Sequence, residues 1–147
     1  MRLAVALLVL SAVVACAPKE EATPDSAAAA APAAPAVADF AGSWHLATVL
    51  EGATDTVKST VNVIADGSCS LVLEGRPNVS CTTSMSGDSL VVQTVEYESI
   101  LRKGVMTSLR SAAILMGQMM HGNLVSTYKM PNGEQKVAGT FTGTKAP

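Results

Sequence analysis

The chain of 147 residues carries a formal net charge of −2, and aromatic residues make up only 3% of it. This length suits a single folded domain once a targeting segment has been removed. Nucleic-acid-binding proteins depend on basic clusters and aromatic stacking side chains, so the composition argues against that class of partner. The aromatic residues all lie from residue 40 onward, where we expect the folded domain: Phe40, Trp44, Tyr97, Tyr128 and Phe141.

Residues 1–15 have the pattern of a secretory signal. Arg2 gives a positive start, residues 3–10 are an unbroken apolar run, and residues 11–15 are small or apolar. The run is too short to span a bilayer, which takes about 20 residues. We therefore expect a signal peptide over residues 1–15 that is absent from the mature protein.

The apolar run ends in Val13-Val14-Ala15-Cys16, which resembles the lipobox of bacterial lipoproteins. The resemblance implies acylation of the Cys16 thiol with chains such as palmitate, cleavage after Ala15, and acylation of the new amino terminus. Two or more acyl chains anchor a protein durably, whereas one is marginal. Ala17, rather than Asp, follows the cysteine, which by the same resemblance implies the outer membrane, facing the periplasm. The alternative is an ordinary secretory signal with an incidental cysteine.

Residues 16–38 are expected to be the lipidated cysteine and a disordered tether. Of the 22 residues from 17 to 38, 11 are Ala and 4 are Pro. Such a segment has almost nothing to bury and cannot offset the entropy lost on ordering. The remaining residues, 39–147, are expected to form one domain.

Apolar and polar residues alternate with a period of two through this domain, and short turn sequences separate the runs. This pattern predicts antiparallel β-strands joined by hairpins and no long helix. One turn, Asp66-Gly67, is expected to be a two-residue turn with positive φ at both positions. The eight predicted strands cover residues 44–50, 57–63, 70–74, 79–86, 89–97, 105–116, 119–130 and 135–144.

An all-β meander of about eight strands buries its edges best by closing into a small up-and-down barrel. The segment Gly42-Ser43-Trp44 resembles the Gly-x-Trp opening of lipocalins and related calycin barrels. The resemblance implies that Gly42 allows a close approach and that Trp44 plugs the closed end. Lipocalins place an Arg over this Trp; here Lys145 is the nearest cation in the last strand, and the second lipocalin motif, Thr-Asp-Tyr, is absent.

Cys69 and Cys81 remain once Cys16 is lipidated, and an oxidising compartment would allow them to pair. If they face each other across a hairpin, Leu71 falls opposite Val79, so apolar residues align on one face. The sequence therefore predicts a disulfide, with two buried free thiols as the alternative.

No catalytic motif appears, so we expect a non-enzymatic protein without a cofactor. The expected function is binding of a small apolar or amphipathic ligand inside a membrane-tethered barrel. The alternative is a structural or assembly lipoprotein with a solid core, acting through contacts with an envelope protein. The candidate ligand-binding residues are Leu46, Val61, Leu71, Leu90, Leu109, Leu124 and Phe141.

A third hypothesis concerns Met116, Met119 and His121. Thioether and imidazole groups are soft ligands that suit Cu(I), and a strand would place Met119 and His121 on one face. The competing interpretation is that the methionines fill gaps in a core that is poor in aromatic residues.

Overall fold

A computed structural model describes residues 33–147 of the chain. The expected signal peptide (1–15), the expected lipidation site Cys16 and residues 17–32 of the expected tether lie outside the described residues. The described part contains one short 3₁₀ helix and nine strands: η1 (Val37–Phe40), β1 (Gly42–Leu50), β2 (Thr56–Val63), β3 (Ser68–Leu73), β4 (Val79–Ser86), β5 (Ser89–Thr94), β6 (Tyr97–Glu98), β7 (Met106–Met116), β8 (Met119–Met130) and β9 (Gly133–Lys145).

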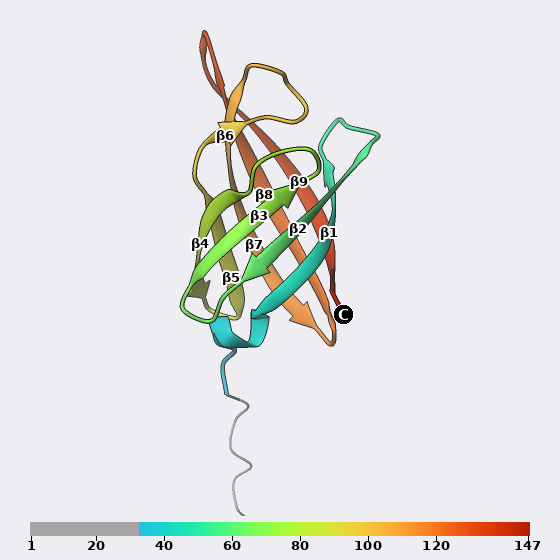
Figure 1. Cartoon of the computed structure of the whole chain (residues 1–147), viewed down its shortest axis with the longest axis vertical. Helices are drawn as coiled ribbons and strands as arrows, with labels where there is room; N and C mark the ends of the chain where they lie inside the picture. Colours follow the sequence, from blue (N-terminus) through green and yellow to red (C-terminus); the bar gives the residue numbers. More distant parts are fainter. Residues whose placement is uncertain (1–32) are drawn as a thin grey trace, which may run out of the picture. The chain divides into compact units, whose positions relative to one another are not determined.

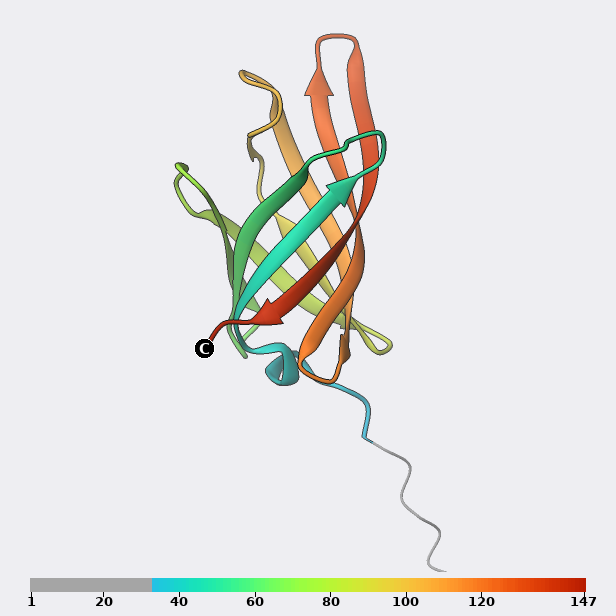
Figure 2. The ribbon, with the colours of Figure 1, turned by 90° about the vertical axis from the view of Figure 1, so that its right-hand side faces the viewer.

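The strands form a closed antiparallel barrel of eight long strands (Figures 1 and 2). Consecutive strands pair with each other except for β5 and β6, and β1 also pairs with β9. The pairing of β5 with β7 completes the ring, and the two-residue β6 extends the edge of β7 beyond β5. The all-β barrel predicted from the sequence is confirmed. Within the described residues, no helix is both long and apolar enough to cross a membrane.

All eight predicted segments are strands, but the fifth is interrupted. Residues 89–97 were expected to form one strand, whereas β5 ends at Thr94 and β6 begins at Tyr97. At the break, the Val95 amide donates a hydrogen bond to the Ser80 carbonyl at 3.0 Å. The chain then makes a loop over residues 99–105 before β7 begins.

The turn between β2 and β3 is one residue longer than the sequence predicted. The Gly67 amide donates to the Ile64 carbonyl at 3.0 Å, so Ala65 and Asp66 are the central residues. Gly67 follows them with a φ of +93°, a conformation that glycine adopts without steric cost. This is the three-residue hairpin loop that ends in a bulge, rather than the two-residue turn.

One end of the barrel, which we call the closed end, is sealed by η1 and the start of β1. Phe40 is 0% exposed and Trp44 is 2% exposed, and the Trp44 Nε1 group donates to the Phe40 carbonyl at 2.8 Å. The Lys145 Nζ atom lies 5.4 Å from the centre of the indole ring, where a cation is attracted by the aromatic face. Gly42 has a φ of +124°, and a Cβ there would lie 3.0 Å from Lys145 Cε.

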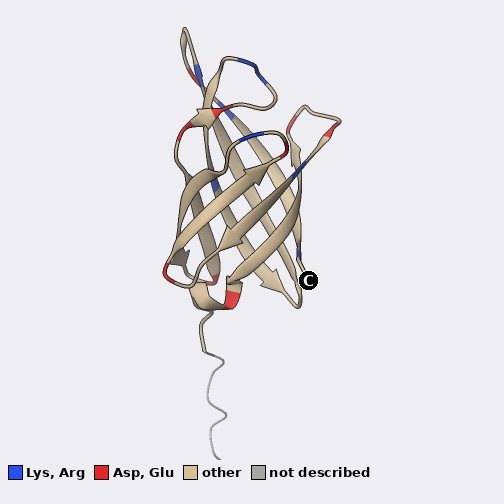
Figure 3. Cartoon of the chain, in the orientation of Figure 1, with Lys and Arg blue, Asp and Glu red and all other residues tan. Residues whose placement is uncertain are grey.

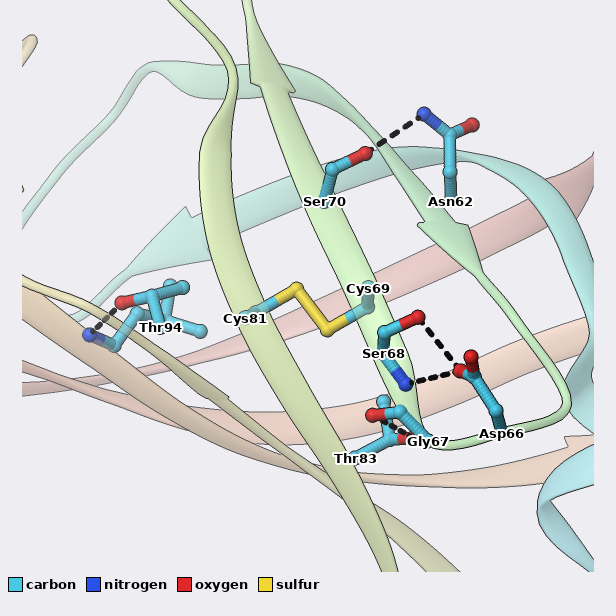
Figure 4. Close-up of a disulfide and its surroundings, with 10 residues drawn as sticks. Asn62, Asp66, Gly67, Ser68, Cys69, Ser70, Cys81, Thr83 and Thr94 are labelled. Atoms are coloured by element: carbon cyan, nitrogen blue, oxygen red, sulfur yellow. Dashed lines mark hydrogen bonds between the residues drawn. A yellow bond between two sulfur atoms is a disulfide. The ribbon is translucent and has the colours of Figure 1, made fainter.

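Cys69 and Cys81 form a disulfide inside the barrel near this end (Figure 4). They are directly opposed in the β3–β4 pairing, with Cα atoms 4.8 Å apart, and Leu71 is opposite Val79. Both the predicted bond and the predicted register are confirmed. The disulfide ties β3 to β4 within the apolar core, where both cysteines are buried.

Replacing the two cysteines, as Cys69→Ala/Cys81→Ala, should lower the free energy of unfolding by about 3 kcal/mol, because the open loop gains entropy in the unfolded chain. Denaturant unfolding of the oxidised protein and of the variant measures this difference. The chemically reduced wild type is the matched control, since it keeps both sulfur atoms. Oxidised and reduced proteins that unfold at the same denaturant concentration would contradict the prediction.

Candidate functional site

The barrel holds a cavity of about 80 Å³ toward the end opposite η1, which we call the open end. Its walls are the inward-facing side chains of the strands, and residues 99–101 of the loop before β7 lie at its mouth. Six of the seven candidate ligand-binding residues line this cavity: Leu46, Val61, Leu71, Leu109, Leu124 and Phe141. The seventh, Leu90, is fully buried in the core and does not reach the cavity.

Hydroxyl groups interrupt the apolar wall, and the pattern of apolar residues in the sequence did not indicate them. Thr94 is satisfied within the protein, because its Oγ1 accepts a hydrogen bond from the Leu109 amide at 2.9 Å. Within residues 33–147, three other buried serine or threonine residues of the lining have hydroxyls that make no hydrogen bond to protein: Thr48, Ser111 and Ser126. No sealed side-chain N or O atom of this part of the chain lacks a partner, so each of these hydroxyls keeps some accessible surface. They are available to a polar group of a ligand or to water.

The cavity is small. Its volume of about 80 Å³ corresponds to roughly three water molecules at liquid density. Pockets for drug-sized ligands measure about 300–1,000 Å³. An occupant of the cavity in this conformation is therefore a short group of a few heavy atoms, and a longer ligand must extend through the mouth.

The loop over the mouth is organised by Ser99. Its Oγ accepts hydrogen bonds from the amides of Leu101 and Arg102, both at 3.1 Å, and its own amide donates to the Val105 carbonyl at 2.8 Å. These bonds turn the chain so that Ile100 and Leu101 stand at the tip, 39% and 50% exposed. Both residues also line the cavity. The mouth is thus bordered by an apolar loop tip that is partly in contact with solvent.

Glu98 holds the base of this loop. Its Oε1 accepts from the Gly104 amide at 2.9 Å, and its Oε2 accepts from the Arg76 guanidinium at 3.1 Å. The Gly104 hydrogen bond first, and the Arg76 partner second, hold the pKa of Glu98 below its usual value. The carboxylate therefore stays charged and joins the loop to the β3–β4 connection.

Arg102 fastens the other side of the loop. Its guanidinium lies 4.5 Å from the centre of the Tyr128 ring and donates to the Gln135 side chain at 2.6 Å. Tyr128 is itself buried and lines the cavity. Near it, burial raises the pKa of Tyr97 to about 12, so this phenol is neutral over the physiological range. The loop tip is therefore apolar, while its flanks are fixed by polar contacts.

Charged residues of both signs gather on the loops of the open end (Figure 3). Besides the Arg76–Glu98 pair, Lys129 and Glu96 form an ion pair between β8 and the segment before β6, and this pair raises the pKa of Lys129. Exposed pairs of this kind contribute little each, because solvent screens them. The rim offers mixed charge rather than a strongly basic or acidic patch.

The two histidines lie outside the cavity. His45 is exposed on β1, where its Nδ1 lies 3.1 Å from Thr60 Oγ1, and His121 lies on the outer face of β8. Neither histidine lines the cavity. Across residues 33–147, no group of three or more His, Cys, Asp or Glu side chains is arranged to hold a metal ion.

Met116, Met119 and His121 share the outer surface of the β7–β8 hairpin near the closed end, away from the cavity. The interpretation that methionines fill the core is wrong for most of the described ones. Met120 is buried and Met85 partly so, whereas four are exposed: Met106, Met116, Met119 and Met130.

No family model matches the chain, and no curated protein matches it.

Acid should loosen the loop at the mouth. Because the pKa of Glu98 is depressed in the folded protein, its stabilising contact is complete above the ordinary glutamate pKa of about 4.3 and is lost as the pH falls through the lower native value. Amide exchange at Gly104, corrected for the intrinsic rate, should show constant protection at neutral pH and a fall below about pH 4.3.

The variant Glu98→Gln should remove this pH dependence, since the amide does not titrate. Glu96→Gln is the matched control, because Glu96 is also a rim carboxylate but pairs with Lys129. An unchanged acid response in Glu98→Gln would show that another group controls the loop.

Proposed function

We propose that this protein is a lipid-anchored lipoprotein of a bacterial envelope whose small barrel binds a small amphipathic ligand at its open end. The observation that carries the proposal is the cavity. Its wall is apolar, and some of its lining hydroxyls make no hydrogen bond to protein. An apolar loop tip borders its mouth. An apolar pocket with a few polar groups is the usual form of a small-molecule site.

The size and chemistry of the cavity define the ligand. A short apolar group of the ligand fills the space beside Ala113 and Leu124, and a hydroxyl or carbonyl group bonds to one of the free hydroxyls of Thr48, Ser111 or Ser126. Because the cavity holds only a few heavy atoms, the rest of the ligand passes Ile100 and Leu101 and meets the mixed charges of the rim. A molecule with a short chain and a polar head has both properties.

The proposed lipid anchor is inferred from the sequence. The lipobox-like segment ending at Cys16 supports lipidation there, and the Ala17 that follows supports the outer membrane, on the periplasmic side. The Ala- and Pro-rich residues after the cysteine are suited to act as a tether. The described chain enters the barrel through η1 at the closed end, opposite the open end (Figure 1).

We further propose that the role is binding rather than catalysis. His45 and His121 both lie on the outer surface, and the polar groups at the cavity are hydroxyls without a base beside them. A nucleophile needs a neighbouring base to become reactive, and the cavity offers none among its lining residues. The cavity is therefore suited to binding a small molecule.

A structural or assembly role is the second candidate, and the small volume of the cavity favours it. The core around Trp44 and Leu90 is fully buried, so side chains fill the barrel toward its closed end. In this role the protein would act through its loops on an envelope protein, and the cavity would hold only water.

Native mass spectrometry of the lipidated protein, purified from its own envelope, distinguishes the two candidates. The wild type should retain a small ligand, and Ala113→Leu should lose it, because the added carbon atoms occupy the cavity. Ala112→Leu is the matched control: it adds the same atoms to the exposed face of the same strand and should keep the ligand. If the wild type shows only the mass of the protein without ligand and takes up no short-chain alcohol, ligand binding is refuted and the assembly role is the candidate that is left.

The anchor has a separate test. Growth with an alkyne analogue of palmitate should label the wild type, and Cys16→Ser should abolish the label, because the thiol that receives the acyl chain is gone. Cys69→Ser/Cys81→Ser serves as the control and should still be labelled. An unlabelled wild type, or equal labelling of Cys16→Ser, would refute lipidation at this cysteine.

A further inference from the structure

Two thioethers stand in solvent at the closed end of the barrel. Met116 is 60% exposed and Met119 is 41% exposed, on either side of the two-residue turn between β7 and β8. Fully burying a methionine side chain is favourable by about 1.5–3 kcal/mol, so these two methionines forgo a large part of that gain. Their place on the outside calls for an explanation other than core packing.

The register of the hairpin brings three soft donor groups onto one patch. Met116 and Met119 are directly opposed, and His121 follows Met119 by two residues on the same outward face of β8. Opposed residues have Cβ atoms about 4.5–5.5 Å apart, and residues two apart on a strand are separated by about 7 Å. The flexible methionine side chains can span these gaps and bring both sulfur atoms and an imidazole nitrogen to one point.

The residues paired with Met119 and His121 on the neighbouring strands are uncharged. His121 is opposite Ile114 on β7 and Thr142 on β9, and Met119 is opposite Thr144. Among the hydrogen bonds of residues 33–147, none involves the His121 ring, whereas His45 lies against Thr60. The direct strand partners of Met119 and His121 include no carboxylate, the oxygen donor that hard cations prefer.

We propose that Met116, Met119 and His121 form a binding site for Cu(I) on the outer face of the β7–β8 hairpin. Soft thioether ligands select Cu(I), imidazole also suits copper, and Cu(I) accepts a coordination number of three. A single positive charge is also easier to accept on a patch without anionic ligands than a divalent charge. The site is separate from the cavity and does not depend on the ligand-binding role.

The test uses the full chain in detergent with Cys16→Ser as the reference background, because a free thiol there would itself bind Cu(I). Cys69 and Cys81 are not available, since they are joined in a disulfide. Titration under ascorbate against the coloured Cu(I) complex of bicinchoninate should show one equivalent of Cu(I) taken up. Met116→Leu/Met119→Leu in this background should weaken the apparent affinity at least tenfold, and His121→Ala should weaken it as well.

Met106→Leu/Met130→Leu is the matched control. It also removes two exposed thioethers, at the opposite end of β7 and β8, and should change the affinity less than twofold. Leu and Met have similar volumes, so both double variants are expected to fold. Failure to take up Cu(I), or equal losses in the two double variants, would overturn the proposal.

A direct readout locates the ion. With ¹³C-methyl methionine, addition of Ag(I), a redox-inert stand-in for Cu(I), should shift the methyl signals of Met116 and Met119 and leave Met106 and Met130 in place. Zn(II) at the same concentration should shift none of them. Shifts spread evenly over all exposed methionines would show unspecific thioether binding and would contradict a site at this hairpin.

Discussion

The pairing of β5 with β7 closes the sheet, and the rest of the structure depends on it. The pairs from Leu90↔Ala113 to Gln93↔Arg110 join strands that would otherwise be exposed edges. Once the ring is closed, each residue of a strand has either an inward or an outward position, because side chains alternate. Closure therefore separates the apolar wall of the cavity from the outer surface. It determines whether each proposed binding residue faces the interior or the solvent.

The two ends of the barrel are held by different interactions. At the closed end, Phe40 and Trp44 are buried, and Lys145 covers the indole. At the open end, the loop of residues 99–105 is fixed by Glu98, Arg102 and Ser99 through hydrogen bonds and ion pairs that solvent reaches. Burial of aromatic side chains stabilises more than exposed ion pairs do, so the open end is where local opening costs least. This difference supports our proposal that a ligand enters the barrel by the open end.

Alternation along the strands allowed the strands and the Cys69–Cys81 register to be predicted from the sequence, and six of the seven candidate ligand-binding residues do line the cavity. Alternation gives the side of the sheet but not the height along the barrel axis, which depends on the stagger between strands. Leu90 shows this limit: it faces inward, as predicted, but lies near the start of β5, among the residues of the closed end. The same parity rule places Ser111 and Ser126 inside, where a search for apolar residues alone misses them. The loop with Ile100 and Leu101 has no periodic pattern, and Ser99 determines its shape through local hydrogen bonds.

Strand β8 carries both proposed sites on opposite faces. Met120 faces the cavity, while Met119 and His121 face solvent, although the three are consecutive in the chain. β8 is hydrogen-bonded along its length to β7 on one side and β9 on the other, and it makes the largest paired surface in the barrel. An occupant on either face can move side chains, but it cannot shift this backbone without breaking both ladders. We therefore expect the interior and the outer patch to bind independently, because a coupling between them would need a second arrangement of β8 that its two partners do not permit.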